Sequence, residues 1–141
     1  MIKLVGNPPP PPVDRSWRVN ASGSWNNDDN WSGADAPNFF GAEAVFGSII
    51  ESPRTVYTET AVTVASVTFD NVNQYAVIGN GSVNFQAGTL NPNAATINVL
   101  QGSHEFQTRV NLLTDVVADV GSSGSLEFNH RLNLGGNMLT K

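Results

Sequence analysis

The sequence predicts an all-β protein, a single-stranded parallel β-helix (β-solenoid) with an aromatic cap at its N-terminal end. Apolar and polar residues alternate in short segments from Thr55 onward, Gly, Asn, Asp and Ser separate these segments, and no apolar stripe of helical period continues for three turns. Short strands with frequent corners favour stacked coils of roughly 20 residues over the longer, hairpin-linked strands of a β-sandwich, which is the alternative.

The individual strands are predicted from the apolar positions that alternate with polar ones. These positions are Val62, Val64, Val67 and Phe69, then Tyr75, Val77, Val83 and Phe85, then Ile97, Val99 and Phe106, and finally Val110, Leu112, Val116, Val120, Leu126, Phe128, Leu132 and Leu134. The segment from Arg109 to Val120 has a period that could also suit a short helix. Its many β-branched residues and the glycine that follows favour a strand.

The chain divides into a proline-rich segment, residues 1–15, and a solenoid module, residues 16–141. The run NPPPPPV at residues 7–13 is typical of polyproline II, which is stiff and cannot join the interior of a sheet. Such a run commonly separates one folded module from another, although it can also wrap the edge of a domain. We therefore expect the folded module to begin at about Ser16.

Composition narrows the range of partners. The net charge is −5 and the basic residues are scattered singly, which disfavours nucleic acid and anionic membrane surfaces as partners. The absence of cysteine excludes thiolate catalysis, zinc–thiolate sites and disulfides. No window approaches the roughly 18 apolar residues of a membrane span, so membrane insertion is not expected. Many Asn, Gly, Ser, Thr and Val residues and few Lys and Glu indicate an extracellular or cell-surface β protein.

The candidate binding residues lie in the segment GSWNNDDNWSGADAPN, residues 23–38, and around it. Trp25 and Trp31, with Trp17, have two interpretations: they stack on sugar rings, or they close the N-terminal mouth of the solenoid, and the capping interpretation is favoured. If they stack, the polar contacts would come from Asn27, Asp29 and Asn30. Phe39 and Phe40 are adjacent, so one should enter the core while the other, here assigned as Phe40, enlarges the platform.

Metal binding and catalysis have weaker support. NNDDN, residues 26–30, is dense in oxygen ligands, but it lacks the spacing of a calcium loop, so an Asx-rich turn is favoured over Ca²⁺ and no cofactor is expected. His104 and Glu105 are adjacent on a strand and point to opposite faces, which favours a structural His104. Carboxylates on successive coils can stack about 4.8 Å apart, yet nothing in the sequence selects one pair. We therefore expect no enzymatic activity.

The order of motifs resembles that of autotransporter-associated β-strand repeat proteins, which are large secreted or surface proteins of environmental bacteria. The matching residues are Trp17, Trp25, Asn30-Trp31 and Pro37, then Ala44-Val45-Phe46, Thr55-Val56 and Ser66-Val67-Thr68-Phe69, and the resemblance extends from about Trp17 to Lys141. It implies an extracellular parallel β-helix with no known catalytic residues.

This sequence departs from the resemblance at LNLGGNMLTK, where relatives usually continue with further coils. We expect a module of a longer protein, or a last coil that is covered by a partner chain. An uncovered last coil would offer unpaired backbone groups for self-association.

Two functions follow as hypotheses. The first is a non-catalytic extracellular carbohydrate-binding module that recognises a plant-type polysaccharide by aromatic stacking and by Asn and Asp hydrogen bonds. The alternative is a structural or adhesive surface solenoid segment with no small ligand. The solvent exposure of Trp25 and Trp31 distinguishes the two.

Overall fold

The computed structural model describes residues 2–4, 6 and 14–141, and the polyproline II prediction for residues 7–13 lies outside them. Its strands and 3₁₀ turns are β1 Asp14–Ser16, β2 Gly23–Ser24, η1 Asp28–Asn30, η2 Ser32–Ala34, β3 Glu43–Phe46, β4 Arg54–Tyr57, β5 Ala61–Val64, β6 Ser66–Asp70, β7 Tyr75–Phe85, β8 Ala95–Leu112, β9 Val116–Val120, β10 Gly124–Phe128, β11 Leu132–Asn133 and β12 Leu139–Thr140. Within the described residues no α-helix forms, and no helix is long and apolar enough to cross a membrane.

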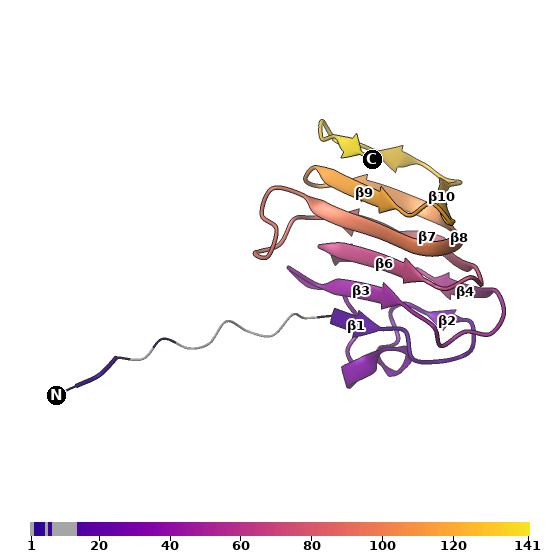
Figure 1. The fold of residues 1–141 in the computed structure, drawn as a ribbon, viewed down its shortest axis with the longest axis horizontal. Coiled ribbons are helices and arrows are strands. Elements are labelled where there is room, and N and C mark those ends of the chain that lie inside the picture. Colours follow the sequence, from indigo (N-terminus) through magenta and orange to yellow (C-terminus); the bar gives the residue numbers. More distant parts are fainter. Residues whose placement is uncertain (1, 5, 7–13) are drawn as a thin grey trace.

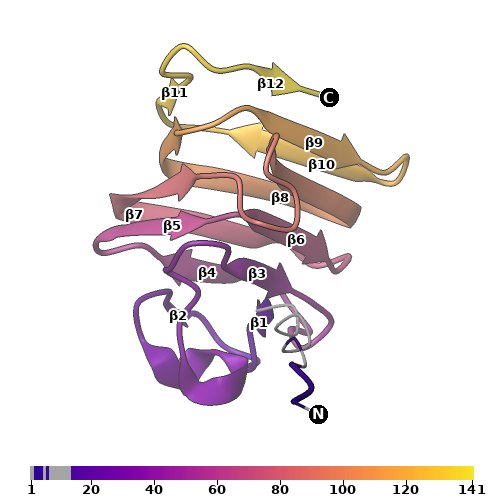
Figure 2. The same ribbon diagram turned by 90° about the vertical axis from the view of Figure 1, so that its left-hand side faces the viewer.

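Every ladder between these strands is parallel, which confirms the predicted β-solenoid and excludes the β-sandwich. A first sheet runs β1-β3-β6-β8-β9-β12, and a second sheet contains β2, β4, β5, β7, β10, β11 and the second half of β8. Four complete coils result: β3–β5, β6–β7, β8 and β9–β11. Figure 1 shows them stacked along one axis, and Figure 2 shows β12 at the end opposite the N-terminal cap.

The folded module begins two residues earlier than predicted. β1 starts at Asp14 and pairs with β3, in the register Arg15 to Ala44 and Ser16 to Val45. No alternating pattern marks this strand, because β1 is only three residues long. Asp14 and Arg15 therefore belong to the solenoid and not to the proline-rich segment.

The core consists of inward side chains stacked from coil to coil. One column joins Phe46, Phe69 and Val99, and another joins Val56, Val77 and Phe106. These side chains are fully buried, so each coil gains apolar burial only when its neighbours are in place. The segment 109–120, the one helix candidate, forms the end of β8 and all of β9, as its β-branched residues predicted.

At a corner of the stack, the backbones of two neighbouring coils approach each other closely. At Gly102 β8 passes from the first sheet to the second with a φ of +84°, and a Cβ there would collide with the carbonyl oxygen of Asn71 in the coil below. Only glycine combines this left-handed backbone with so close an approach. The glycine therefore allows a strand of 18 residues to turn a corner without breaking.

Candidate functional site

The aromatic cap consists of Trp17, Trp25 and Trp31, which the segment between β1 and β3 holds against the first complete coil. Two 3₁₀ turns shape this segment, and the first is capped by Asn27, whose Oδ1 accepts a hydrogen bond from the Asp29 amide at 3.1 Å. Trp17 and Trp31 also form an isolated antiparallel bridge. The polar residues of the segment thus fold the backbone so that its tryptophans face inward.

The three indoles pack on one another and on Phe46. The Trp17 ring meets Trp31 edge-on at a centroid distance of 5.3 Å and an angle of 88°, and Trp25 lies 5.2 Å from Trp31. Trp25 and Trp31 both contact Phe46 at 5.4 Å. Below them Phe46 stacks on Phe69 at 5.2 Å, so the cap continues into the aromatic core.

Each indole N–H is satisfied inside the cap. Trp25 Nε1 donates to the carbonyl oxygen of Pro37 at 3.0 Å, and Trp31 Nε1 donates to that of Trp25 at 2.8 Å. Trp17 Nε1 donates to Ala21 at 3.3 Å. These bonds leave no N–H of the three rings free for a ligand hydroxyl.

The burial of the rings decides between the two interpretations of the tryptophans. Trp25 and Trp31 have 0% exposed surface and Trp17 has 2%, so no ring face is open to a sugar. The capping interpretation is confirmed. The assignment of Trp17, Trp25 and Trp31 as stacking residues is wrong, because their apolar area is covered by the first coil and by the loop that carries them.

The polar residues assigned to the same site stabilise the loop. Asn30 Nδ2 donates to the carbonyl oxygen of Ser24 at 2.9 Å, and Asp28 Oδ1 accepts from the Ala36 amide at 2.9 Å. Asn27 and Asp29 are exposed, but they surround no open aromatic face. They do not form the predicted sugar site with the tryptophans, because the indoles are buried while Asn27 and Asp29 are exposed.

The NNDDN segment forms the Asx-rich turn that was favoured over a calcium loop. Asn26 Oδ1 accepts from the Glu59 amide at 3.1 Å, so this oxygen, like those of Asn27 and Asp28, is engaged by a backbone amide. Among the residues that the structure describes, no group of three or more His, Cys, Asp or Glu side chains converges as a metal site.

Phe39 and Phe40 divide between core and surface as expected. Phe39 packs against the core, with the Arg15 guanidinium 5.7 Å from its ring centroid, whereas Phe40 is 61% exposed. Phe40 keeps its exposed ring, but the indoles that it was expected to extend are buried. It is therefore an exposed aromatic side chain outside the buried indole cluster, which is ordinary on a protein surface.

His104 is a buried structural residue. Its Nδ1 accepts from the Tyr75 amide at 3.1 Å, so its Nε2 carries the proton and donates to the carbonyl oxygen of Gln101 at 2.8 Å. The ring stacks on Phe69 at 4.6 Å. Burial lowers the pKa of His104, and the backbone hydrogen bonds to Gln101 and Asn71 oppose this shift to a smaller degree. The neutral imidazole joins two coils.

The structure selects one carboxylate pair that the sequence alone did not. Glu105 and Glu127 are in register on neighbouring coils, and Asn129 Nδ2 bridges them at 2.7 and 3.2 Å. Glu105 is half-buried and Glu127 is exposed on the second sheet, where the amide of Asn129 holds the two carboxylates together.

The register also reveals an internal repeat that the sequence analysis missed. EFQTRVN, residues 105–111, pairs in register with EFNHRLN, residues 127–133, so the period is 127 − 105 = 22 residues. A search for self-similarity near 20 residues would have found it. Asn84, Asn111 and Asn133 form a ladder along the same face, with Asn111 Nδ2 donating to Asn84 Oδ1 at 2.8 Å.

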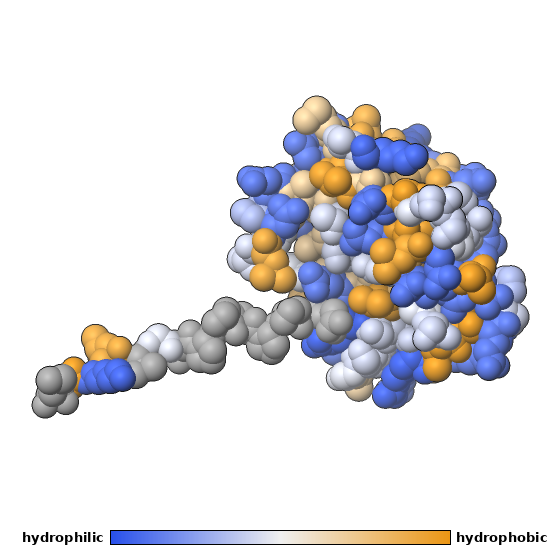
Figure 3. Space-filling view, in the orientation of Figure 1, coloured by the Kyte–Doolittle hydropathy of each residue, from blue (hydrophilic) through white to orange (hydrophobic). Residues whose placement is uncertain are grey.

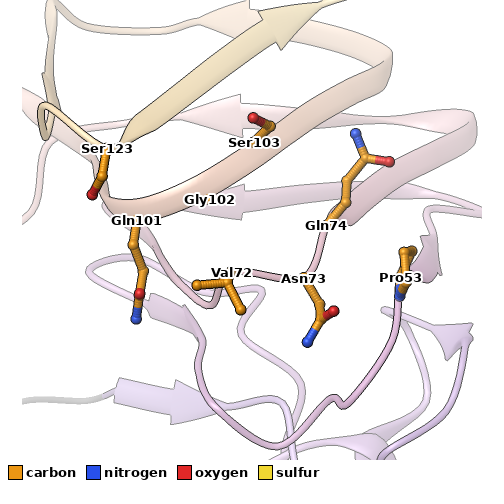
Figure 4. Close-up of a pocket in the computed structure, with 8 residues that line it drawn as sticks. All are labelled: Pro53, Val72, Asn73, Gln74, Gln101, Gly102, Ser103 and Ser123. Carbon is orange, nitrogen blue, oxygen red and sulfur yellow. The ribbon is translucent and has the colours of Figure 1, made fainter.

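A second feature that the sequence did not indicate is a hollow of about 480 Å³ at one corner of the stack, lined by Pro53, residues 72–74, residues 101–103 and Ser123. These residues come from all four complete coils. In Figure 4, Val72 and Asn73 lie between Gln101 on one side and Pro53 on the other. The sequence did not indicate this hollow, because its residues are 19 to 27 positions apart from one coil to the next.

No protein-family model matches this chain, and no curated protein or solved structure matches it. The resemblance to autotransporter-associated β-strand repeat proteins therefore stays a prediction.

Proposed function

We propose that this chain is a non-catalytic structural solenoid segment of the cell surface or the extracellular space, and that it supplies a rigid support. The observation that carries this proposal is the burial of all three indoles at 2% exposure or less. Residues that would have been the ligand platform instead close one end of the coil stack.

The packing of the coils supports the same conclusion. Each coil shares ladders and core columns with its neighbours, and aromatic contacts continue from Trp31 through Phe46 and Phe69 to Phe106. A stack in which every coil is held by the next resists bending, since bending would open parallel ladders and separate buried rings.

The outer surface suits a support more than a reaction centre. In Figure 3 apolar side chains are interspersed with hydrophilic ones on the visible face, and the stacked amides Asn84, Asn111 and Asn133 bond to one another along the second sheet. Carbohydrate recognition by tryptophan stacking, the other hypothesis, loses its support because no indole face is open.

The test is a distance measurement between two ends of the stack. The chain contains no cysteine, so Glu59→Cys and Ser125→Cys, both at exposed positions, can be spin-labelled without side reactions. Double electron–electron resonance should give one narrow distribution of the distance between the two spin labels in the folded protein. The same labelled chain in concentrated urea supplies the broad reference distribution. A broad or bimodal distribution in the folded protein contradicts the proposal.

A further inference from the structure

The corner hollow has a lining without charge. None of its eight residues carries an ionisable side chain: they provide amides, hydroxyls, one glycine, Pro53 and Val72. A phosphate, carboxylate or metal ligand would find no counter-charge here, so the lining suits a neutral ligand that is rich in hydrogen-bonding groups. The volume of about 480 Å³ lies within the usual range of ligand pockets.

Two of the amides are held in fixed orientations. Gln101 Nε2 donates to Asp70 Oδ1 at 2.8 Å, and Asn73 Nδ2 donates to Asn71 Oδ1 at 3.2 Å. The orientation of Asn71 is itself determined, because its Nδ2 donates to two carbonyl oxygens. Gln101 and Asn73 therefore present their Oε1 and Oδ1 atoms as acceptors, and little conformational entropy remains to be lost when a ligand binds.

Donors and apolar surface complete the hollow. Within the described residues, the side chains of Gln74, Ser103 and Ser123 make no hydrogen bond inside the protein, so their amide and hydroxyls are free to bind a ligand. Val72 is 74% exposed and supplies apolar surface, and in Figure 4 Pro53 lies on the other side of Asn73. Polar groups beside a small apolar surface match the hydroxyl edges and C–H faces of a sugar ring.

The hollow is elongated along the solenoid axis. It takes residues from four successive coils, and three spacings of about 4.8 Å give a length of roughly 14 Å. An extended peptide is a poorer fit, because the strands at this corner are already paired in parallel ladders and offer no free edge for strand addition.

We propose that this hollow binds a segment of a neutral polysaccharide, with Gln101 and Asn73 as fixed acceptors, Gln74, Ser103 and Ser123 as adjustable polar contacts, and Val72 as the apolar contact. The site is separate from the aromatic cap. This site goes beyond the structural role proposed above, because it would add the binding of a polysaccharide to that role.

The experiment is affinity gel electrophoresis of the native chain in gels that contain hydroxyethylcellulose, xylan, mixed-linkage β-glucan or galactomannan, with polygalacturonate as the charged comparison. We expect retardation by at least one of the neutral polymers. The double variant Gln74→Ala/Ser103→Ala removes two contacts that have no partner inside the protein, so it should fold normally and bind about tenfold more weakly.

The matched control is Asn80→Ala/Thr89→Ala, which removes one amide and one hydroxyl at exposed positions outside the hollow and should leave retardation unchanged. Three results would overturn the proposal: no retardation by any of the four neutral polymers, retardation by polygalacturonate alone, or equal binding by both double variants. The spin-label distances do not depend on this site, so the two proposals can fail separately.

Discussion

Replacing Trp25 with alanine tests whether the aromatic cap stabilises the solenoid. The ring is fully buried, and an indole buries about 150–250 Å² of surface, which at about 25 cal/mol/Å² corresponds to roughly 4–6 kcal/mol of transfer free energy. Alanine retains a part of this, and Trp→Ala substitutions in cores commonly cost about 3–5 kcal/mol. Loss of the Nε1–H also leaves the Pro37 carbonyl oxygen without its partner.

The assay is urea unfolding followed by far-ultraviolet circular dichroism. With an m-value of about 2 kcal/mol/M, a loss of about 4 kcal/mol moves the midpoint of unfolding down by about 2 M. Phe40→Ala is the control, because that ring is 61% exposed and its removal should change stability by less than about 0.5 kcal/mol. If Trp25→Ala costs less than about 1 kcal/mol, or no more than Phe40→Ala, the indoles do not stabilise the fold as their burial indicates.

Two further predictions concern the middle of the stack. Because the pKa of His104 is lowered in the folded protein, the unfolded chain binds more protons than the folded chain once the pH falls below about 6.5. The free energy of unfolding should therefore decrease between this pH and the folded-state pKa. Urea unfolding of the native chain and of His104→Asn at pH 7.5 and pH 5 measures this, and a constant difference between the two proteins would contradict it. Gly102→Ala should cost more than about 2 kcal/mol, because alanine meets both the left-handed φ and the Asn71 carbonyl oxygen. Gly47→Ala, where an added Cβ has no neighbour within 4 Å, is its control in the same titration, and equal costs would refute the steric explanation.

The fold could be predicted from the sequence because its signals are local. Alternation such as Val62 and Val64, followed by corners rich in Gly and Asn, depends only on neighbouring residues, and the parallel stack is the arrangement that buries one face of so many short strands. The start of the module was missed because β1 owes its existence to pairing with β3 and not to its own three residues.

The binding site could not be predicted in the same way. Whether Trp25 is exposed depends on Phe46 and Pro37, which are 21 and 12 positions away, so the polar residues next to the ring left both interpretations open. The corner hollow depends on register: Gln74 and Ser103 meet only because β7 and β8 pair with Ala76 opposite Glu105. Residues so far apart become neighbours through the coil period, and the 22-residue repeat that reveals this period occurs only in the last two coils.

The placement of all three indoles at one end makes the protein's intrinsic fluorescence a local reporter. Tryptophan emission will follow the opening of the cap alone, whereas circular dichroism averages over every coil. In a quasi-one-dimensional stack the two signals coincide only if the coils melt together. A difference between their midpoints would show from which end the structure frays.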